Sequence, residues 1–235
     1  MASDTFRKEL FDFTGGLNNR AANTKIRDNE ASDILNMVFN TFGPIETRAG
    51  YEAINSSVGT DGVYGLGQYT QYDGTKIFLA VIGTKLYKLV GATWTEVGSG
   101  LTNNQYTSIL TVGGDAYLAN GVDPLQKYDG VSMAATAAQP GSPPSYLISI
   151  HSPPRIFALR GKDYHSRYYW SDPGAFSTWG GSSYEELPNG DEIVGGGILF
   201  GRPIIFGKES IFMIVGTDPD TWELRQVSSS VGLVS

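Results

Sequence analysis

The chain has 235 residues, of which 40% are hydrophobic and 17% are charged, and its formal net charge is −7 at pH 7. This apolar content is enough to bury a core, so wholesale disorder is excluded, and the acidic balance disfavours sequence-independent binding of nucleic-acid phosphates. The absence of cysteine excludes disulfides and thiolate metal sites.

Residues 1–55 are predicted to form an extended arm with one short helix. The first ten residues have no apolar h-region, and no run of about 18 apolar residues occurs in the chain, so we expect neither a secretory signal nor a membrane span. Phe11–Phe13 is a short alternating stretch, Thr14–Gly16 is a turn signal, and residues 18–25 are polar. This composition is typical of chain that lies extended on a surface.

The best helix candidate is Asp28–Met37. Asp28 can cap the helix, and Glu30 falls in the first turn, where the helix dipole favours an anion. Ile34 and Met37 share one face at helical spacing. A strand, a turn and a second strand are then predicted at 37–39, 43–44 and 45–48.

Residues 56–235 are predicted to be a repeat region. Four segments each hold an apolar strand, a glycine turn, a strand rich in aromatic residues and a polar turn. The turn glycines lie 38, 40 and 46 positions apart, at Gly83, Gly121, Gly161 and Gly207. A period of roughly 40–50 residues with four short strands is typical of a β-propeller blade. Inner strands are predicted just before each segment, at Gly62–Gly67, Tyr106–Leu110, Tyr146–Ile150 and Glu192–Gly195.

The fold class that follows is all-β, with about four β-propeller-like blades that need not complete a ring. Unrelated hairpins in a sandwich or a β-solenoid are the alternative. Val231–Ser235 has the composition of a further strand that is just beginning. We therefore expect either that the chain is a piece of a longer product or that partner chains complete the structure.

No catalytic, cofactor-binding or metal-binding residue is predicted, and no enzyme activity is expected. A glycosidase needs two carboxylates about 5–10 Å apart, but Glu185-Glu186 and Asp191-Glu192 are adjacent pairs, whose side chains point to opposite faces of a strand. His151 and His165 have no second histidine at a chelating spacing. The sequence also lacks a Gly-x-Ser-x-Gly nucleophile elbow.

One turn resembles a motif of another propeller class. Ser171–Trp179 is similar to the Asp-box of sialidase-like propellers, and Thr217–Trp222 is a weaker echo of it. Asp and Gly suit such a turn because Asp can bond its own backbone and Gly can adopt positive φ. We expect a purely structural role for both turns.

The N-terminal segment carries a second resemblance. Phe13–Asn18 is followed by Asp28–Asn36, then by Gly43 and Arg48–Tyr51. This order resembles the start of a family of phage virion proteins, which includes tail tubular proteins of the nozzle type and related tail-hub or stabilisation proteins. The sequence departs from that pattern at Ala49, where proline is common.

The resemblance implies a phage tail structural protein, made in the host cytoplasm and located in the virion. Its expected partners are copies of itself, in a ring or tube, and adjacent tail or adaptor proteins. DNA is expected to pass through the assembly without specific binding. The polar turn of the arm is the expected contact with a neighbouring subunit, at Gly15, Gly16, Leu17, Asn18, Asn19 and Arg20.

Two other functions are kept as alternatives. A receptor- or carbohydrate-binding β-propeller would use tryptophans as stacking platforms, with Trp94, Trp170, Trp179 and Trp222 as the candidates. A sialidase-like hydrolase would gather arginines around one pocket. The arginines are instead scattered through the repeat region, at Arg155, Arg160, Arg167, Arg202 and Arg225.

Overall fold

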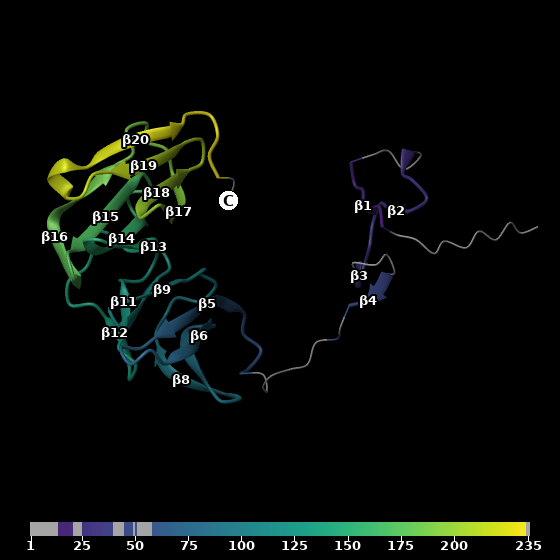
Figure 1. Cartoon of the computed structure of the whole chain (residues 1–235). Helices are drawn as coiled ribbons and strands as arrows, with labels where there is room; N and C mark the ends of the chain where they lie inside the picture. Colours follow the sequence, from purple (N-terminus) through teal and green to yellow (C-terminus); the bar gives the residue numbers. More distant parts are fainter. Residues whose placement is uncertain (1–13, 21–24, 40–44, 49, 51–57, 234–235) are drawn as a thin grey trace, which may run out of the picture. The chain divides into compact units, whose positions relative to one another are not determined.

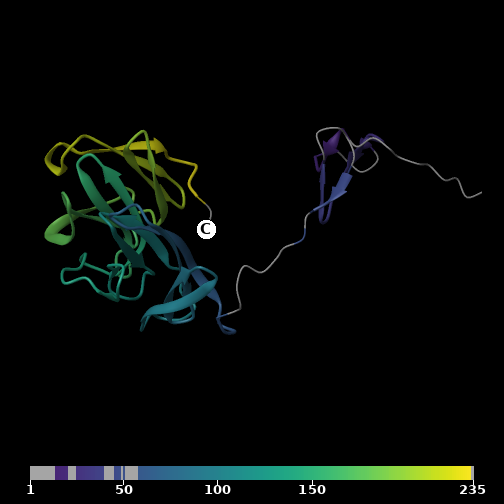
Figure 2. The same cartoon turned by 60° about the horizontal axis from the view of Figure 1, so that its bottom comes forward.

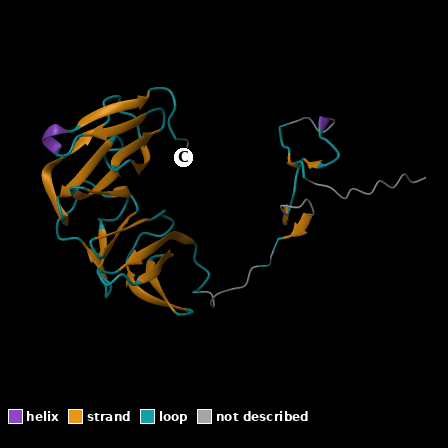
Figure 3. Cartoon of the chain, viewed as in Figure 1, coloured by secondary structure: helices purple, strands orange, loops and turns teal. Residues whose placement is uncertain are grey.

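The computed structural model describes residues 14–20, 25–39, 45–48, 50 and 58–233, and strands make up most of this part (Figure 3). The chain divides into two compact units, Met1–Ile54 and Asn55–Ser235. The stretch at Phe11–Phe13 and the turn at 43–44 lie outside the described residues. Each unit is described below by itself.

The first unit contains two small strand pairs. Strand β1 (Gly16–Leu17) pairs in parallel with β2 (Glu30–Ala31). Strand β3 (Met37–Phe39) pairs antiparallel with β4 (Ile45–Thr47). The predicted strands at 37–39 and 45–48 are therefore present.

The helix predicted at Asp28–Met37 is wrong. This segment forms a turn, β2, a pair of bends and the start of β3. Its polar residues compete for backbone hydrogen bonds outside a helix, and Asn36 has φ 57°, which no residue of a right-handed helix adopts. The backbone bonds run to other segments, since Asn18 N donates to Ala31 O and Arg48 N donates to Asn36 O.

The second unit consists of four antiparallel sheets of four strands each, and every sheet follows the chain order of its strands (Figure 1). We call these sheets blades 1 to 4. Blade 1 contains β5 (Val63–Thr70), β6 (Lys76–Ile82), β7 (Lys85–Val90) and β8 (Thr93–Ser99). Blade 2 contains β9 (Ser108–Val112), β10 (Asp115–Ala119), β11 (Gln126–Tyr128) and β12 (Met133–Ala135).

Blades 3 and 4 repeat this arrangement. Blade 3 contains β13 (Pro144–His151), β14 (Pro154–Gly161), β15 (Arg167–Asp172) and β16 (Ala175–Glu186). Blade 4 contains β17 (Ile193–Leu199), β18 (Arg202–Gly207), β19 (Ile211–Val215) and β20 (Glu223–Ser228), with the 3-10 turn η2 (Pro219–Thr221) before its last strand. The predicted four-unit repeat is confirmed, and each predicted inner strand overlaps the first strand of a blade. The predicted turn positions of Gly161 and Gly207 are wrong, because these glycines are the last residues of β14 and β18.

The first strands of successive blades pack side by side. Contacts join β5 to β9, β9 to β13 and β13 to β17, and these strands lie on the concave side of the arc of sheets (Figure 1). Figure 2 shows the same succession from a turned view. Close approach explains the glycine of β5, because a Cβ on Gly67 would lie 2.8 Å from Ile109 of β9.

Three apolar clusters lie between the blades, one at each junction. The cluster between blades 1 and 2 includes Tyr69, Leu79 and Val81 on one side and Leu118 and Tyr128 on the other. The cluster between blades 2 and 3 is formed by Tyr117, Ala119, Leu125, Leu147, Ile156, Ala158, Tyr169 and Trp179. The cluster between blades 3 and 4 includes Ile148, Phe157, Leu159, Ile193, Ile205, Phe212 and Ile214. The core of this unit is therefore a series of blade-on-blade interfaces.

A polar contact accompanies the clusters at the first two junctions. Tyr69 Oη donates to Gly114 O at 2.8 Å between blades 1 and 2, and the hydroxyls of Tyr117 and Ser177 lie 3.1 Å apart between blades 2 and 3. Buried hydroxyls that are hydrogen-bonded avoid the cost of desolvation. These contacts fix the lateral position of one blade on the next.

The ring of blades is open. Within the part of the chain that the structure describes, β5 and β17 do not pack together as successive first strands do. The fold is therefore all-β with four propeller-like blades in an open arc, as predicted.

Candidate assembly interface

The turn predicted to contact a neighbour is tied into its own unit. Gly15 N donates to Asn29 O at 3.0 Å, and Asn18 Nδ2 donates to Glu30 Oε2 at 2.8 Å. The bond from Asn18 lowers the pKa of the Glu30 carboxyl, and a second bond from the backbone of Arg27 adds to this effect. The backbone of this turn is thus committed to internal bonds.

The outward side chains of the same turn remain exposed. Leu17, Asn19 and Arg20 are all exposed to solvent. Arg20 N donates to Asn18 Oδ1 at 3.3 Å, which holds the chain after the turn. The six predicted residues therefore form one continuous segment that includes β1, with Leu17, Asn19 and Arg20 as its exposed side chains.

Among the described residues of the second unit, two blade faces have no blade packed against them. We call the face that a blade turns to the next blade its forward face, and the opposite face its rear face. Every internal interface joins a forward face to the next rear face, as the three clusters show. The rear face of blade 1 and the forward face of blade 4 have no partner face among the four blades.

The rear face of blade 1 is apolar at its centre. Leu66 on β5 is 69% exposed and Phe78 on β6 is 59% exposed. Leu66 is paired with Ala80, which is paired in turn with Tyr87, and cross-strand partners share a face of the sheet. Large apolar side chains at this exposure are the usual mark of an interaction surface when they are contiguous.

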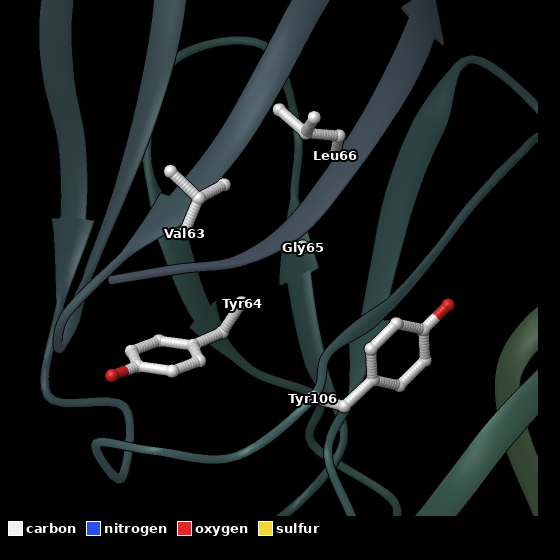
Figure 4. A pocket seen from close by; sticks show the side chains of 5 residues that line it. All are labelled: Val63, Tyr64, Gly65, Leu66 and Tyr106. Carbon is white, nitrogen blue, oxygen red and sulfur yellow. The ribbon is translucent and has the colours of Figure 1, made fainter. Parts of the chain in front are cut away.

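A pocket of about 390 Å³ lies beside this face, at the start of β5. It is lined by Val63, Tyr64, Gly65, Leu66 and Tyr106 (Figure 4). A β-bulge between Val63 and Gly65 resets the alternation, so Val63 and Leu66 project to one side of the strand and Tyr64 to the other. The Tyr64 hydroxyl donates to Asn104 Oδ1.

The forward face of blade 4 is also apolar. Ile204 pairs with Met213, and Phe206 pairs with Ile211. These four side chains are half-buried within the sheet and point away from blade 3, because Ile205 and Phe212 between them belong to the cluster on the other side. At the tip of the β17–β18 hairpin, Phe200 is 94% exposed.

Blades 1 and 3 each have a buried leucine just after their last strand, whereas the buried residue at this place in blade 2 is Thr136. Leu101 follows blade 1 and is 5% exposed, and Leu187 follows blade 3 and is 2% exposed. The backbone N–H of each donates to the connection between the second and third strands of its own blade, at Thr84 O and Ser166 O. Leu187 belongs to the cluster between blades 3 and 4, and Leu101 to the cluster between blades 1 and 2.

Leu233 occupies the corresponding place after blade 4. Its N–H donates to Gly207 O at 2.9 Å, and its side chain lies over Gly195, on the forward face. Leu233 is 46% exposed, since no blade covers it. Sequence reasoning missed these uncovered residues, although the recurrence of leucine after the strands was a usable signal.

A smaller polar pocket of about 110 Å³ lies at the ends of the first strands. Its lining residues come from blades 2 and 3 and from the connection before blade 2: Gln105, Tyr106, Asn120, Ser145, Tyr146 and Arg160. Arg160 has φ 57°, a conformation that costs energy in a side-chain-bearing residue. Its Nη2 donates to Glu192 Oε1 at 2.6 Å, and its buried Nε has no hydrogen-bond partner.

The acidic pairs are engaged locally. Glu185 accepts from the Tyr168 hydroxyl, and Glu186 accepts from Arg167. Asp191 accepts from Ser210 Oγ at 2.7 Å and from Glu209 N at 2.9 Å. The described residues contain no group of three or more His, Cys, Asp or Glu side chains that could hold a metal ion.

Three of the four tryptophans belong to interblade contacts. Trp170 and Trp222 pack edge to face with ring centroids 5.0 Å apart, and Trp222 also lies 5.3 Å from Phe157. Trp179 is buried between blades 2 and 3. These rings are not the exposed coplanar platform that a sugar-binding surface needs.

The Asp-box-like turn at Ser171–Trp179 joins β15 to β16. Ser171 is fully buried, and its Oγ accepts from Ile156 N at 3.0 Å. Arg155 Nη1 donates to Ser171 O at 2.7 Å, and Gly174 takes φ 70° in the turn. These contacts anchor the turn to β14.

Comparisons with known proteins bear on the fold. No protein-family model matches the sequence, and no curated protein sequence matches it. Among solved structures, the chain is similar to PorZ, an essential bacterial surface component of the type-IX secretion system of human oral-microbiomic Porphyromonas gingivalis. The TM-score is 0.53 at 16% identity, over 83% of this chain and 26% of the PorZ chain.

This likeness supports the blade architecture, and the chain spans about a quarter of the length of PorZ. The described residues include no helix long and apolar enough to cross a membrane. Fold and surface together define a class: an open, propeller-like set of blades with two uncovered apolar ends.

Proposed function

We propose that this protein is a structural component of a phage tail, at the tube, nozzle or hub. In this role it assembles with copies of itself and with adjacent tail or adaptor proteins. The blades form a rigid wall, and the uncovered faces and the arm make the contacts. The role is mechanical, so it requires no catalytic group, metal or cofactor.

The observation that carries the proposal is the pair of uncovered apolar faces. A monomeric protein in solution rarely exposes a large contiguous apolar surface. A subunit of an assembly exposes such a surface where it contacts its neighbours. The rear face of blade 1, with Leu66 and Phe78, has this character. The resemblance of residues 11–51 to the start of phage virion proteins supports the same assignment.

The acidic charge fits a wall along which DNA moves. A net charge of −7 repels phosphates, so DNA passes without being held. This part of the proposal concerns passage only, and it assigns no DNA-binding residue.

The test is to locate the protein in particles. Antibody raised against the purified chain is expected to label the tails of intact virions, and mass spectrometry of purified particles is expected to detect the chain in fixed proportion to the other tail proteins. The corresponding gene is expected to lie beside portal, terminase and tail genes. Particles that lack the chain after purification would refute the assignment.

A second candidate, a receptor- or carbohydrate-binding module, rests on the polar pocket. Tyr106 and Tyr146 offer aromatic faces there, and Asn120, Ser145 and Arg160 offer hydrogen-bonding groups. Such a set can hold a small polar ligand. If this candidate is right, a glycan array detects binding that Tyr106→Ala abolishes, while Tyr72→Ala, at another exposed position outside the pocket, leaves it intact.

A further inference from the structure

The chain holds three copies of one kind of interface. In each, the forward face of a blade meets the rear face of the next, with an apolar cluster at the centre. The chain therefore also holds one unmatched forward face, on blade 4, and one unmatched rear face, on blade 1. These two faces are therefore of the two types that pack together at each interface within the chain.

Leu233 shows what the forward face of blade 4 lacks. Its counterparts Leu101 and Leu187 are buried because the next blade covers them. Leu233 makes the same type of backbone bond to its own blade and stands on the same face, yet 46% of it is exposed. The missing element is therefore the rear face of a blade.

Charges at the outer strands do not oppose such a contact. On blade 1, Lys85 pairs with Glu96 at 2.8 Å, and on blade 4, Arg225 pairs with Glu223 at 3.0 Å. Both ion pairs are partly exposed. In each pair the two charges lie in the same chain and balance one another. Each face thus has an apolar centre and a self-neutralised rim, the usual anatomy of a protein interface.

We propose that two copies of this chain close head to tail, with the forward face of blade 4 of each copy packed on the rear face of blade 1 of the other. This contact continues the interface that already repeats inside the chain. It buries Leu233, Ile204 and Phe206 of one copy against Leu66 and Phe78 of the other.

The number of copies follows from the number of blades. A head-to-tail contact gives a closed ring if the rotation closes, and an open filament if it does not. Propellers typically contain about 4–8 blades. Four blades per chain leave the arc open, two chains supply eight, and a third chain would exceed the range. The two-copy ring also has a twofold axis, the commonest symmetry of soluble oligomers.

The first test is the mass of the full chain in solution, by sedimentation velocity or mass photometry. The expected particle has twice the mass of the chain. Leu66→Asp and Phe78→Asp are each expected to raise its dissociation constant about tenfold or more, because each places a charge in the apolar centre. Val131→Asp, at an exposed apolar position outside both faces, is expected to leave the mass unchanged.

The second test identifies which faces are in contact. Because the chain has no native cysteine, only the introduced cysteines can react with a thiol-specific cross-linker. Leu66→Cys and Leu233→Cys variants are mixed, allowed to exchange subunits, and treated with a short thiol-to-thiol cross-linker. The mixture is expected to give linked pairs, and either variant alone is expected to give none, because equivalent residues lie in different interfaces.

Three results would overturn the proposal. They are a single-chain mass at every concentration, an open series of larger species, and linkage within either variant alone, which would indicate a symmetric face-to-face contact. The inference deepens the proposed tail role by naming its self-contact. Because the mass and cross-linking measurements need no phage particle, their failure is distinguishable from failure to find the chain in virions.

Discussion

Glu192 connects two cations near the junction of blades 3 and 4. Its carboxylate accepts from Lys208 Nζ and from Arg160 Nη2, both at 2.6 Å. The bond from Lys208 is the largest cause that lowers the pKa of Glu192 from its usual value of 4.5; partial burial opposes it, and Arg160 adds to it. Arg160 is held in the left-handed region, so this carboxylate stabilises a strained residue that also lines the polar pocket.

The pairing of the Glu192 carboxylate with Lys208 and Arg160 predicts that the stability of the protein depends on pH. Because the pKa of Glu192 is lower in the folded state than in the unfolded state, its stabilising effect is fully present above 4.5 and is lost as the pH falls through the folded value. Glu192→Gln is therefore expected to lower the free energy of unfolding by about 1 kcal/mol at neutral pH. The difference from the wild-type protein is expected to shrink below pH 4.5.

Urea denaturation of both proteins at neutral and acidic pH measures this difference. Glu223→Gln is the control, since its pair with Arg225 is exposed on both sides and is expected to contribute little. A difference between wild type and Glu192→Gln that stays constant from neutral to acidic pH would show that Glu192 acts through packing rather than through its charge.

At the scale of the element, β17 shows how closely the blades approach. A Cβ on Gly196 would lie 2.3 Å from Leu159 Cδ1 of blade 3, whereas a Cβ on Gly197, which points to the opposite face, would lie no closer than 3.9 Å to Phe206. Adjacent residues of a strand point to opposite faces. One glycine is thus required by the interface, and its neighbour is not.

Gly196→Ala is therefore expected to destabilise the protein by about 1–3 kcal/mol, because the added methyl group overpacks the junction of blades 3 and 4. Gly197→Ala, measured at low protein concentration, is expected to change the free energy of unfolding by less than about 0.5 kcal/mol. The urea concentrations at which the two variants are half unfolded measure this difference. Equal losses would mean that backbone freedom, rather than contact with Leu159, explains the glycine at position 196.

The elements of the repeat could be predicted from sequence because their signals are local. Glycines such as Gly83 and Gly121 stand in turns with positive φ, 59° and 76°, and their spacing reports the length of a blade. The helix at Asp28–Met37 was predicted wrongly because ten residues with a suitable cap do not make a helix without a surface to pack on. Leu35, in the middle of that segment, is mostly exposed.

The uncovered faces could not be predicted in the same way. Leu66 and Leu79 are both apolar residues of blade 1, yet one is exposed and the other fully buried. What separates them is the presence of a neighbouring blade, which depends on the order of sheets in space. The polar pocket escaped prediction for a related reason, because Tyr106, Asn120 and Arg160 come from distant parts of the chain.

At the scale of the whole molecule, the two units have separate means of stability. All three apolar clusters lie within the second unit, between Tyr64 and Leu224. In the first unit, the described pairs β1–β2 and β3–β4 have only two or three residues per strand. The apolar clusters that the structure describes between the blades are therefore built from residues of the second unit.

A shortened protein of residues 58–235 is accordingly expected to fold. Its free energy of unfolding is expected to match that of the blades in the full chain to within about 0.5 kcal/mol, because all members of the three apolar clusters are retained and independent sites contribute additively. Tryptophan fluorescence in urea follows this unit alone, since all four tryptophans belong to it. A large fall in the midpoint would show that the first unit supports the blades.

Each blade is built from one contiguous stretch of chain, with its four strands in sequence order. The gene for such a protein can therefore gain or lose a whole blade by a single duplication or deletion of the segment between two successive blade connections, with each remaining sheet intact. The number of blades can thereby change in evolution, while each forward face still packs on the rear face of the next blade. Relatives of this protein are expected to differ in length by multiples of one blade.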